Sequence, residues 1–269
     1  MPKLKDIVNG FSKELIDICE NPKKEVKTLL CASLDKDILW LMTHDNEDID
    51  IPKDFLNNIE KRKKSIPLEY ILNKASFFSS EFYVDDRVLI PRPETELLVE
   101  KVVNRCKDIE DITIAEIGTG SGIISIMLSL LLPKAQIIAT DLSKEALEVA
   151  QINANKHGVN ERIKFVNCNL LDDVHEHIDI LVSNPPYIKD DEILDKNLSY
   201  EPNLALYGGV VGDEILKKII DIAINKKVLL LACEMGYDQR DKISEYLHKF
   251  DLKAEFYRDY TGLDRGFLL

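Results

Sequence analysis

From about residue 94 onward, short apolar runs alternate with longer segments in which apolar residues recur every three or four positions. The short runs predict buried strands, and the longer segments predict helices. The expected strands cover residues 112–117, 135–140, 163–167, 178–183, 227–233, 252–258 and 265–269, and the expected helices cover residues 94–107, 121–132, 143–157, 212–226 and 237–249. This alternation predicts an α/β fold with a mostly parallel sheet and helices on both faces. The last two strands have no helix between them, so one of them should be antiparallel.

Residues 1–73 show only the helical period. The expected helices run over Leu4–Cys19, from Asn21-Pro22, near Ile38–Leu41 and from Pro52. Nothing in this stretch resembles a catalytic constellation, so docking a partner is its natural role. Residues 74–91 are richer in aromatic and β-branched residues, with turn candidates at Ser79-Ser80 and Asp85-Asp86, and they predict a connecting β-hairpin. The chain is therefore expected to divide into a helical domain (1–73), a hairpin linker (74–91) and an α/β domain (92–269).

A glycine-rich loop stands between the strand at 112–117 and the helix that follows it, with the sequence Gly118-Thr119-Gly120-Ser121-Gly122. Glycines allow positive φ and a close approach to a ligand, and the N-terminus of a helix after such a loop is a ligand-binding position. A dinucleotide site would have the spacing G-x-G-x-x-G, but Ile123 breaks it. Glu116 would repel a pyrophosphate and would accept from an ammonium group. These features favour S-adenosylmethionine, whose amino-acid tail is zwitterionic.

Three further residues follow the next two strands. Asp141 lies 23 residues after Gly118, close to the interval expected for an acid that binds ribose hydroxyls. Its alternative role is to cap the next helix, a place that Ser143 could also take. After the third strand, Asn169 is positioned to hydrogen-bond an adenine edge and Leu170 to cover an adenine face.

The tetrapeptide Asn184-Pro185-Pro186-Tyr187 directly follows the apolar run at 178–183. Open α/β sheets bind ligands just past the carboxyl ends of their strands, and two prolines make this turn stiff. The Asn184 side-chain carbonyl and the Pro185 backbone carbonyl are two acceptors that can hold both N–H bonds of a planar –NH₂ group. Tyr187 can lie flat on the same plane. The arrangement suits alkylation of an amide or an exocyclic amine, whereas the alternative is a plain Pro-Pro turn.

The chain resembles class I S-adenosylmethionine-dependent methyltransferases acting on planar nitrogens. The features that carry this resemblance, in chain order, are Glu116 with its loop, Asp141, Asn169-Leu170 and Asn184–Tyr187. More closely, the chain resembles the peptide chain release factor glutamine methyltransferases (HemK/PrmC family) from residue 66 to its end. The stretches that carry this likeness are Ile66–Ile71, Val88–Glu96, Tyr200–Leu206, Glu234–Gly236 with Gln239, and Asp259–Gly262 with Arg265. Two positions depart from the family. Asn73 stands where the family usually has Gly, and Leu170 stands where an aromatic residue often stacks on adenine.

The resemblance implies a Rossmann-like, seven-stranded sheet and S-adenosylmethionine as cofactor, with S-adenosylhomocysteine as product. The implied cofactor-binding residues are Glu116, Gly118, Thr119, Gly120, Ser121, Gly122, Asp141, Asn169, Leu170 and, through a secondary contact, Asn184. The implied substrate-binding residues are Asn184, Pro185, Pro186 and Tyr187, of which Asn184, Pro185 and Tyr187 are the catalytic ones, and no metal is required. The implied substrate is the glutamine of the Gly-Gly-Gln motif in class I peptide chain release factors.

Net charge bears on the alternative that the acceptor is an exocyclic amine of adenine or guanine in nucleic acid. The chain carries −13 in total, and residues 1–75 hold 13 Lys+Arg against 14 Asp+Glu, so nearly all of the excess lies in the α/β part. An acidic catalytic domain is a poor match to a phosphate backbone, so no direct nucleic-acid partner is expected. A silent adaptor that only binds S-adenosylmethionine is a third possibility, which the intact Asn184 and Pro185 disfavour.

Other bulk features point to a cytoplasmic protein with no membrane partner. The longest apolar run, Ile123–Leu132, is far short of the roughly 20 residues that cross a bilayer, and the N-terminus has no signal-peptide pattern. The five cysteines are scattered without a C-x-x-C pair, which indicates reduced thiols. The basic run Lys61–Lys64 is expected to be the solvated end of a helix.

Overall fold

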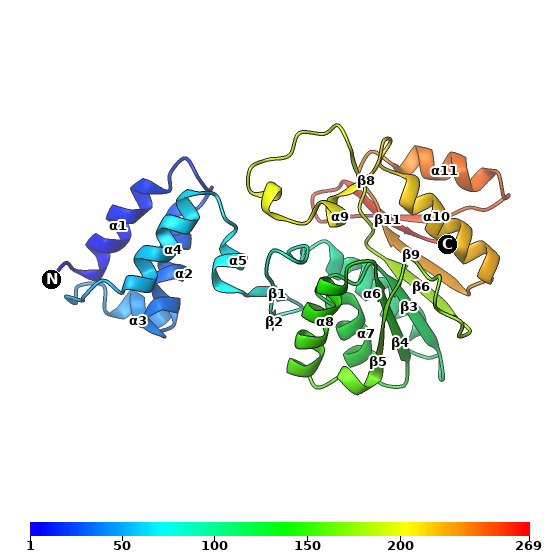
Figure 1. Cartoon of the computed structure of the whole chain (residues 1–269), viewed down its shortest axis with the longest axis horizontal. Coiled ribbons are helices and arrows are strands. Elements are labelled where there is room, and N and C mark those ends of the chain that lie inside the picture. The colour runs from blue at the N-terminus through cyan, green and yellow to red at the C-terminus, as the bar shows by residue number, and fades with distance from the viewer. The chain divides into compact units, whose positions relative to one another are not determined.

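The computed structural model describes all residues, 1–269, and contacts within the chain divide it into two compact units (Figure 1). The first unit comprises Met1–Lys74 together with Asp195–Tyr200. The second comprises Ala75–Leu194 together with Glu201–Leu269. None of the helices in either unit has the length and apolar character needed to span a membrane.

Five helices form the first unit: α1 (Leu4–Glu14), α2 (Pro22–Leu34), α3 (Ile38–Thr43), α4 (Lys53–Lys63) and α5 (Leu68–Leu72). Their apolar faces enclose a core in which Leu29 and Phe55 are fully buried, each worth about 1.5–3 kcal/mol relative to exposure. The first helix was predicted to reach Cys19, and this is wrong. The N–H groups of Ile18 and Cys19 both donate to the Leu15 carbonyl, so the apolar spacing continues through a turn after the helix has ended.

Asn73 ends the short helix α5, which sequence reasoning missed. It has φ of 52°, in the left-handed region; its N–H donates to the Tyr70 carbonyl, and the N–H of Lys74 donates to the Glu69 carbonyl. Among residues other than glycine, asparagine adopts this conformation at low cost. The departure from the family's glycine at this position therefore preserves the turn that ends the helix.

Arg62 is buried, which corrects the expectation that Lys61–Lys64 is simply a solvated helix end. Its Nε lies 2.5 Å from Glu25 Oε2, and its Nη1 donates to the Ile66 carbonyl at 3.3 Å. The neighbouring Lys63 and Lys64 are exposed as expected. A buried ion pair of this kind loses several kcal/mol when one partner is removed, because the other charge is left without a partner, so Arg62 ties α4 to α2.

The hairpin predicted within 74–91 exists but is shorter than expected. Strand β1 (Ala75–Phe77) pairs antiparallel with β2 (Ser80–Phe82), and the turn residues Phe78 and Ser79 have φ of 49° and 57°. Two consecutive residues with positive φ form the tight two-residue hairpin turn whose twist matches that of the flanking strands. After Phe82 the chain leaves the ladder. Both the N–H and the carbonyl of Tyr83 instead bond to the side chain of Asn153, a residue on helix α8 (Lys144–Lys156).

The second unit is built on a seven-stranded sheet with the order β10-β11-β9-β6-β3-β4-β5 (Figure 1). Its strands are β3 (Thr113–Ile117), β4 (Gln136–Asp141), β5 (Ile163–Asn167), β6 (Ile180–Ser183), β9 (Leu230–Glu234), β10 (Glu255–Arg258) and β11 (Asp264–Leu268). Adjacent strands from β5 to β9 pair in parallel, whereas β11 is antiparallel to both of its neighbours. The prediction of a mostly parallel sheet with one antiparallel strand near its end is confirmed.

Helices cover both faces of this sheet. They are α6 (Thr95–Cys106), α7 (Ile123–Leu131), α8, α10 (Glu214–Lys226) and α11 (Arg240–His248). One core contains residues of α6, α7 and α8, and the other contains residues of α10 and α11. Successive residues of β3 alternate between them, with Ile114 in the first core and Ala115 in the second. This alternation follows from the two-residue period of a strand and explains why the central strands read as unbroken apolar runs.

The chain reverses direction across the sheet beside β3, because β4 and β5 lie on one side of it and β6 and β9 on the other. In this register Ile117 and Ser183, the last residues of β3 and β6, are direct partners. The Ser183 hydroxyl also donates to the Ile117 carbonyl at 2.7 Å. The loops that leave these two strands therefore start side by side at the switch point, where open α/β sheets bind ligands.

The close approach of β11 to β9 yields a stability prediction. A Cβ at Gly266 would lie 2.4 Å from the Cys233 carbonyl oxygen and 2.4 Å from the Tyr257 hydroxyl, so Gly266→Ala should destabilise the protein by about 1–3 kcal/mol. Gly10→Ala is the matched control, since a Cβ at Gly10 meets nothing within 4 Å and alanine favours a helix interior. Urea denaturation should give a lower free energy of unfolding for Gly266→Ala only. Equal values for Gly266→Ala and the wild type would contradict the packing described.

Candidate functional site

The glycine-rich loop connects β3 to α7 with all three of its glycines at positive φ, 74° at Gly118, 54° at Gly120 and 83° at Gly122. The N–H groups of Gly118 and Thr119 both donate to the Thr140 carbonyl at the end of β4, which holds the loop against the sheet. At Gly122 a Cβ would lie 3.1 Å from the Ala150 Cβ on α8. Glycine is thus favoured there by its positive φ and also by the tight packing of α7 against α8.

Glu116 lies under this loop with 1% of its surface exposed. Its Oε2 accepts from the Thr119 hydroxyl at 2.8 Å, from the Ser125 N–H at 3.0 Å and from the Ser125 hydroxyl, whereas its Oε1 has no partner. Burial raises the pKa of Glu116 to about 7, despite these hydrogen bonds. A buried carboxylate oxygen without a partner is costly, so it is well suited to accept a hydrogen bond from a ligand.

Asp141 is not the helix cap that the alternative reading proposed. Ser143 caps α8 by accepting from the Ala146 N–H at 3.1 Å. The Asp141 carboxylate instead accepts from the Gly120 N–H and the Ser143 N–H, each at 2.9 Å, and burial raises its pKa. Each carboxylate oxygen has one further acceptor position. Asp141 therefore shapes the glycine-rich loop and still has capacity to accept from a ligand.

The turn after β5 contains the two residues expected near adenine. Asn169 is exposed and donates from Nδ2 to Asp172 at 3.1 Å. Leu170 has φ of 50°, a conformation uncommon for leucine, and its carbonyl accepts from the Thr140 hydroxyl at 2.8 Å. Its side chain packs partly buried against the core that also contains α10 and α11. Backbone strain of this kind is concentrated at functional sites.

The tetrapeptide begins directly after β6. Asn184 is half-buried, and its Nδ2 donates to the Thr95 hydroxyl at 3.2 Å. Pro185 is buried, whereas Pro186 and Tyr187 are half-buried. Burial and the nearby Glu234 carboxylate raise the pKa of the Tyr187 phenol, which therefore stays neutral at physiological pH.

Glycines 208 and 212 pack closely against the tetrapeptide. A Cβ at Gly208 would lie 2.5 Å from the Pro186 carbonyl oxygen, and one at Gly212 would lie 2.6 Å from that of Tyr187. The Gln239 side chain donates to the Tyr187 and Gly212 carbonyls at 3.2 and 2.9 Å. Close backbone approach therefore explains why glycine stands at positions 208 and 212.

One pocket in the second unit joins the two loops. Its lining includes Glu116, residues 118–121 and Asn184, together with residues from the segment that leads into α6, namely Leu89, Pro91, Arg92 and Thr95. Asp141, Asn169 and Leu170 are not part of this lining. The structure therefore brings Glu116 and the glycine-rich loop together with Asn184, whereas Asp141, at the end of β4, and Asn169 and Leu170, in the turn after β5, lie outside this lining.

Sequence reasoning assigned no role to Arg92 or Thr95. Arg92 donates to Glu201 at 2.6 Å, and the second carboxylate oxygen of Glu201 accepts from the Ile90 N–H at 2.9 Å. Glu201 is buried and thereby anchors the segment that leads into α6. Both residues belong to Val88–Glu96, a stretch that resembles the family, and no spacing rule connects it to strands that come later in the chain.

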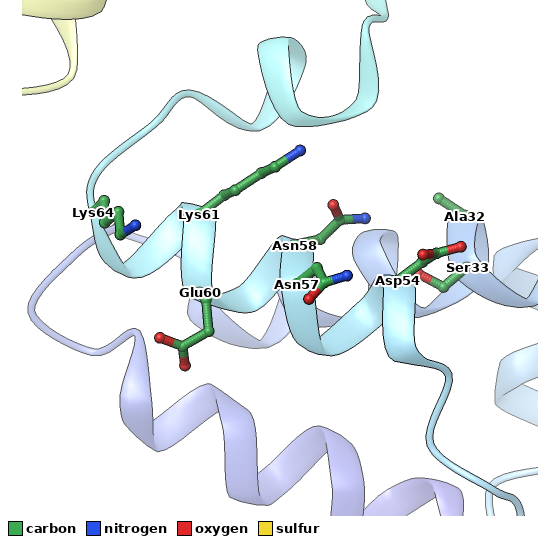
Figure 2. A pocket seen from close by; sticks show the side chains of 8 residues that line it. All are labelled: Ala32, Ser33, Asp54, Asn57, Asn58, Glu60, Lys61 and Lys64. Atoms are coloured by element: carbon green, nitrogen blue, oxygen red, sulfur yellow. The ribbon is translucent and has the colours of Figure 1, made fainter.

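A second hollow lies within the first unit (Figure 2). Figure 2 shows its side chains projecting from α4, including Asn57, Asn58 and Lys61, and from α2, at Ala32 and Ser33. Most of these residues are exposed, and the lining carries both signs of charge. It is a polar surface hollow, unlike the pocket over buried Glu116.

Comparison with known proteins gives matches along both units. The family description "Methyltransferase small domain" matches residues 92–199, and "PrmC N-terminal domain" matches residues 6–72. The crystal structure of a methyltransferase from Pyrococcus furiosus is similar in fold, with a TM-score of 0.53 and 19% identity over 71% of this chain and 88% of that one. The predicted Rossmann-like methyltransferase fold is confirmed.

Curated relatives extend the likeness to almost the whole chain. A release factor glutamine methyltransferase from Clostridium acetobutylicum is 34% identical over 98% of this chain and 96% of its own length. Another, from Chlorobaculum tepidum, is 39% identical over 77% of this chain and 75% of its own length. This chain, a methyltransferase, therefore belongs to the release factor glutamine methyltransferase family.

Proposed function

We propose that this protein transfers a methyl group from S-adenosylmethionine to the side-chain amide nitrogen of the glutamine in the Gly-Gly-Gln motif of class I peptide chain release factors. The observation that carries the proposal is that Asn184 and the glycine-rich loop over Glu116 line the same pocket. The names and extent of the curated relatives support the same substrate. The acidic character of the second unit favours a protein acceptor over nucleic acid.

The pocket fits the charged amino-acid tail of S-adenosylmethionine. The partnerless Oε1 of Glu116 is an acceptor for the ammonium group, and the loop glycines leave room for close approach of the backbone. Asp141 would accept from ribose hydroxyls with its remaining lone pairs, and Asn169 and Leu170 would meet the adenine. When bound, this cofactor supplies a methyl group on a positively charged sulfur.

The chain's own contribution is to position and activate the acceptor amide. Its nitrogen is a poor nucleophile because the lone pair is delocalised into the carbonyl. Asn184 Oδ1 and the Pro185 carbonyl would accept its two N–H bonds, orient the nitrogen and stabilise the positive charge that develops during transfer. Tyr187 would stack on the amide plane and exclude water. Well-oriented reactions gain roughly 7–11 kcal/mol from such positioning, and no general base is needed because the proton can leave after transfer.

The first unit would contribute substrate affinity. It lacks buried catalytic groups, and its likeness to the PrmC N-terminal domain supports a role in holding the release factor. Binding energy from such remote contacts helps to position the reacting amide.

The pKa of Glu116 leads to a prediction about cofactor binding. An ammonium group binds the ionised carboxylate, so affinity should fall as the pH drops below about 7. It should also fall above roughly pH 8, where the α-amino group loses its own charge. Calorimetry on Glu116→Gln should show weaker binding without the acid-side decline. Glu234→Gln is the matched control, since burial also raises the pKa of Glu234 to about 7, and this variant should keep the decline. An acid-side decline that survives in Glu116→Gln would refute the role given to Glu116.

Asn184→Ala should remove nearly all methyl transfer while leaving cofactor binding largely intact. Losing one preorganised group that stabilises transition-state charge typically costs roughly 10²–10³-fold in rate. Single-turnover kinetics with labelled S-adenosylmethionine measure the chemical step, and calorimetry measures the cofactor. A single-turnover rate near that of the wild type in Asn184→Ala would contradict the role proposed for Asn184 in methyl transfer.

The acceptor atom is tested with variants of the substrate. A release factor whose Gly-Gly-Gln glutamine is replaced by alanine should take no label. Glutamate should also fail, because its carboxylate has no N–H for Asn184 and Pro185 to accept. Mass spectrometry should place one methyl on that glutamine of the unmodified factor. Label on DNA or RNA, with the factor untouched, would overturn the proposed substrate.

A further inference from the structure

Thr95 is a buried residue that contacts the catalytic loop from a different part of the chain. It is the first residue of α6, is 1% exposed, and its hydroxyl accepts from Asn184 Nδ2 at 3.2 Å. Its backbone is fixed by a hydrogen bond from its N–H to the Arg92 carbonyl at 3.1 Å. Its side chain does not cap the helix, because the N-cap of α6 is Glu94 and no side-chain cap bond is formed. The hydroxyl is therefore engaged by the site and not by its own helix.

A second buried group, the carboxyl of Glu234, interacts with Thr95. Glu234, the last residue of β9, is 2% exposed, its Oε1 has no partner, and Thr95 opposes the rise that burial causes in its pKa. A threonine hydroxyl has a single proton. If that proton goes to the Glu234 carboxylate, the oxygen of Thr95 can only accept from Asn184. In the structure the NH₂ end of the Asn184 amide does face Thr95.

The direction matters because the two ends of an amide are nearly the same in shape and opposite in hydrogen bonding. With Nδ2 held by Thr95, the Oδ1 end is turned away from Thr95. If the Asn184 amide were rotated by 180°, its NH₂ group would face the NH₂ group of the substrate amide. Two hydrogen-bond donors would then oppose each other. Only one of the two orientations can hold a planar –NH₂ substrate.

We infer that Thr95 is a positioning residue that locks the Asn184 amide with its oxygen toward the substrate nitrogen, an inference that rests on the proposed function. An ionised Glu234 would take the Thr95 proton and so favour this direction. The cation of Arg265 favours the charged form of Glu234, and Arg265 is held in turn by Asp259 at 2.7 Å. Asp259 is itself fixed by the N–H groups of Thr261 and Leu263, at 2.9 and 3.1 Å.

Valine and serine at position 95 separate the hydroxyl from the shape of the side chain. Thr95→Val keeps the branched shape and removes the hydroxyl, so kcat should fall by about tenfold or more with cofactor affinity unchanged. Thr95→Ser keeps the hydroxyl and should restore kcat to within about threefold of the wild type. Thr113→Val is the matched control, because Thr113 begins β3, lies outside the pocket and should tolerate a β-branched residue.

A second measurement reports the lock directly and needs no substrate. The side-chain NH₂ signal of Asn184, assigned by its loss in Asn184→Ala, should shift and exchange faster with solvent in Thr95→Val. It should be unchanged in Thr113→Val. This readout also separates the two proposals. A wild-type enzyme that labels no release factor would refute the proposed function, whereas the NMR result would still decide the lock.

Three results would overturn the inference. The first is a Thr95→Val enzyme with wild-type kcat or with an unchanged Asn184 NH₂ signal. The second is a Thr95→Ser enzyme as slow as Thr95→Val. The third is a parallel loss of cofactor affinity in Thr95→Val, which would mean that Thr95 supports the fold of the pocket and not the orientation of one amide.

Discussion

The pairing of β3 with β6 is the constraint on which the site depends. The two strands are far apart in the sequence, yet Ile117 and Ser183 are partners in the ladder and are also joined by the Ser183 hydroxyl. Both strands are buried on both faces, so their register is strongly specified. Because the two loops leave from paired residues, the glycine-rich loop and Asn184 of the tetrapeptide line one pocket.

Two buried carboxyl groups, Glu116 in the pocket lining and Glu234 at the end of β9, are stabilised in different ways. Glu116 is stabilised by hydroxyl and N–H donors on one oxygen, and Glu234 by Thr95 and the charge of Arg265. Burial still raises the pKa of both to about 7. Such carboxylates cost stability, and proteins retain them where an unsatisfied oxygen or a fixed hydrogen-bond direction serves a ligand.

Glycine serves two separate purposes here. In the loop after β3 it supplies positive φ and, at Gly122, helix packing. Behind the tetrapeptide, Gly208 and Gly212 allow two backbones to pack almost in contact, while Gln239 joins the same carbonyls. The stiffness of the Pro185-Pro186 turn therefore comes from its surroundings as well as from its own rings. Substrate positioning of the kind proposed requires this rigidity.

The sequence by itself determined what local pattern can encode. It predicted the alternating strands and helices, the glycine-rich loop and the tetrapeptide at a strand end, because each is written in consecutive residues. Only the tertiary structure decided contacts between distant segments. Thr95 meets Asn184 across 89 positions, Arg62 is buried by Glu25, and Gly208 packs on Pro186. Local periodicity does not predict such pairs, since they depend on strand order and on which faces of the sheet the helices cover.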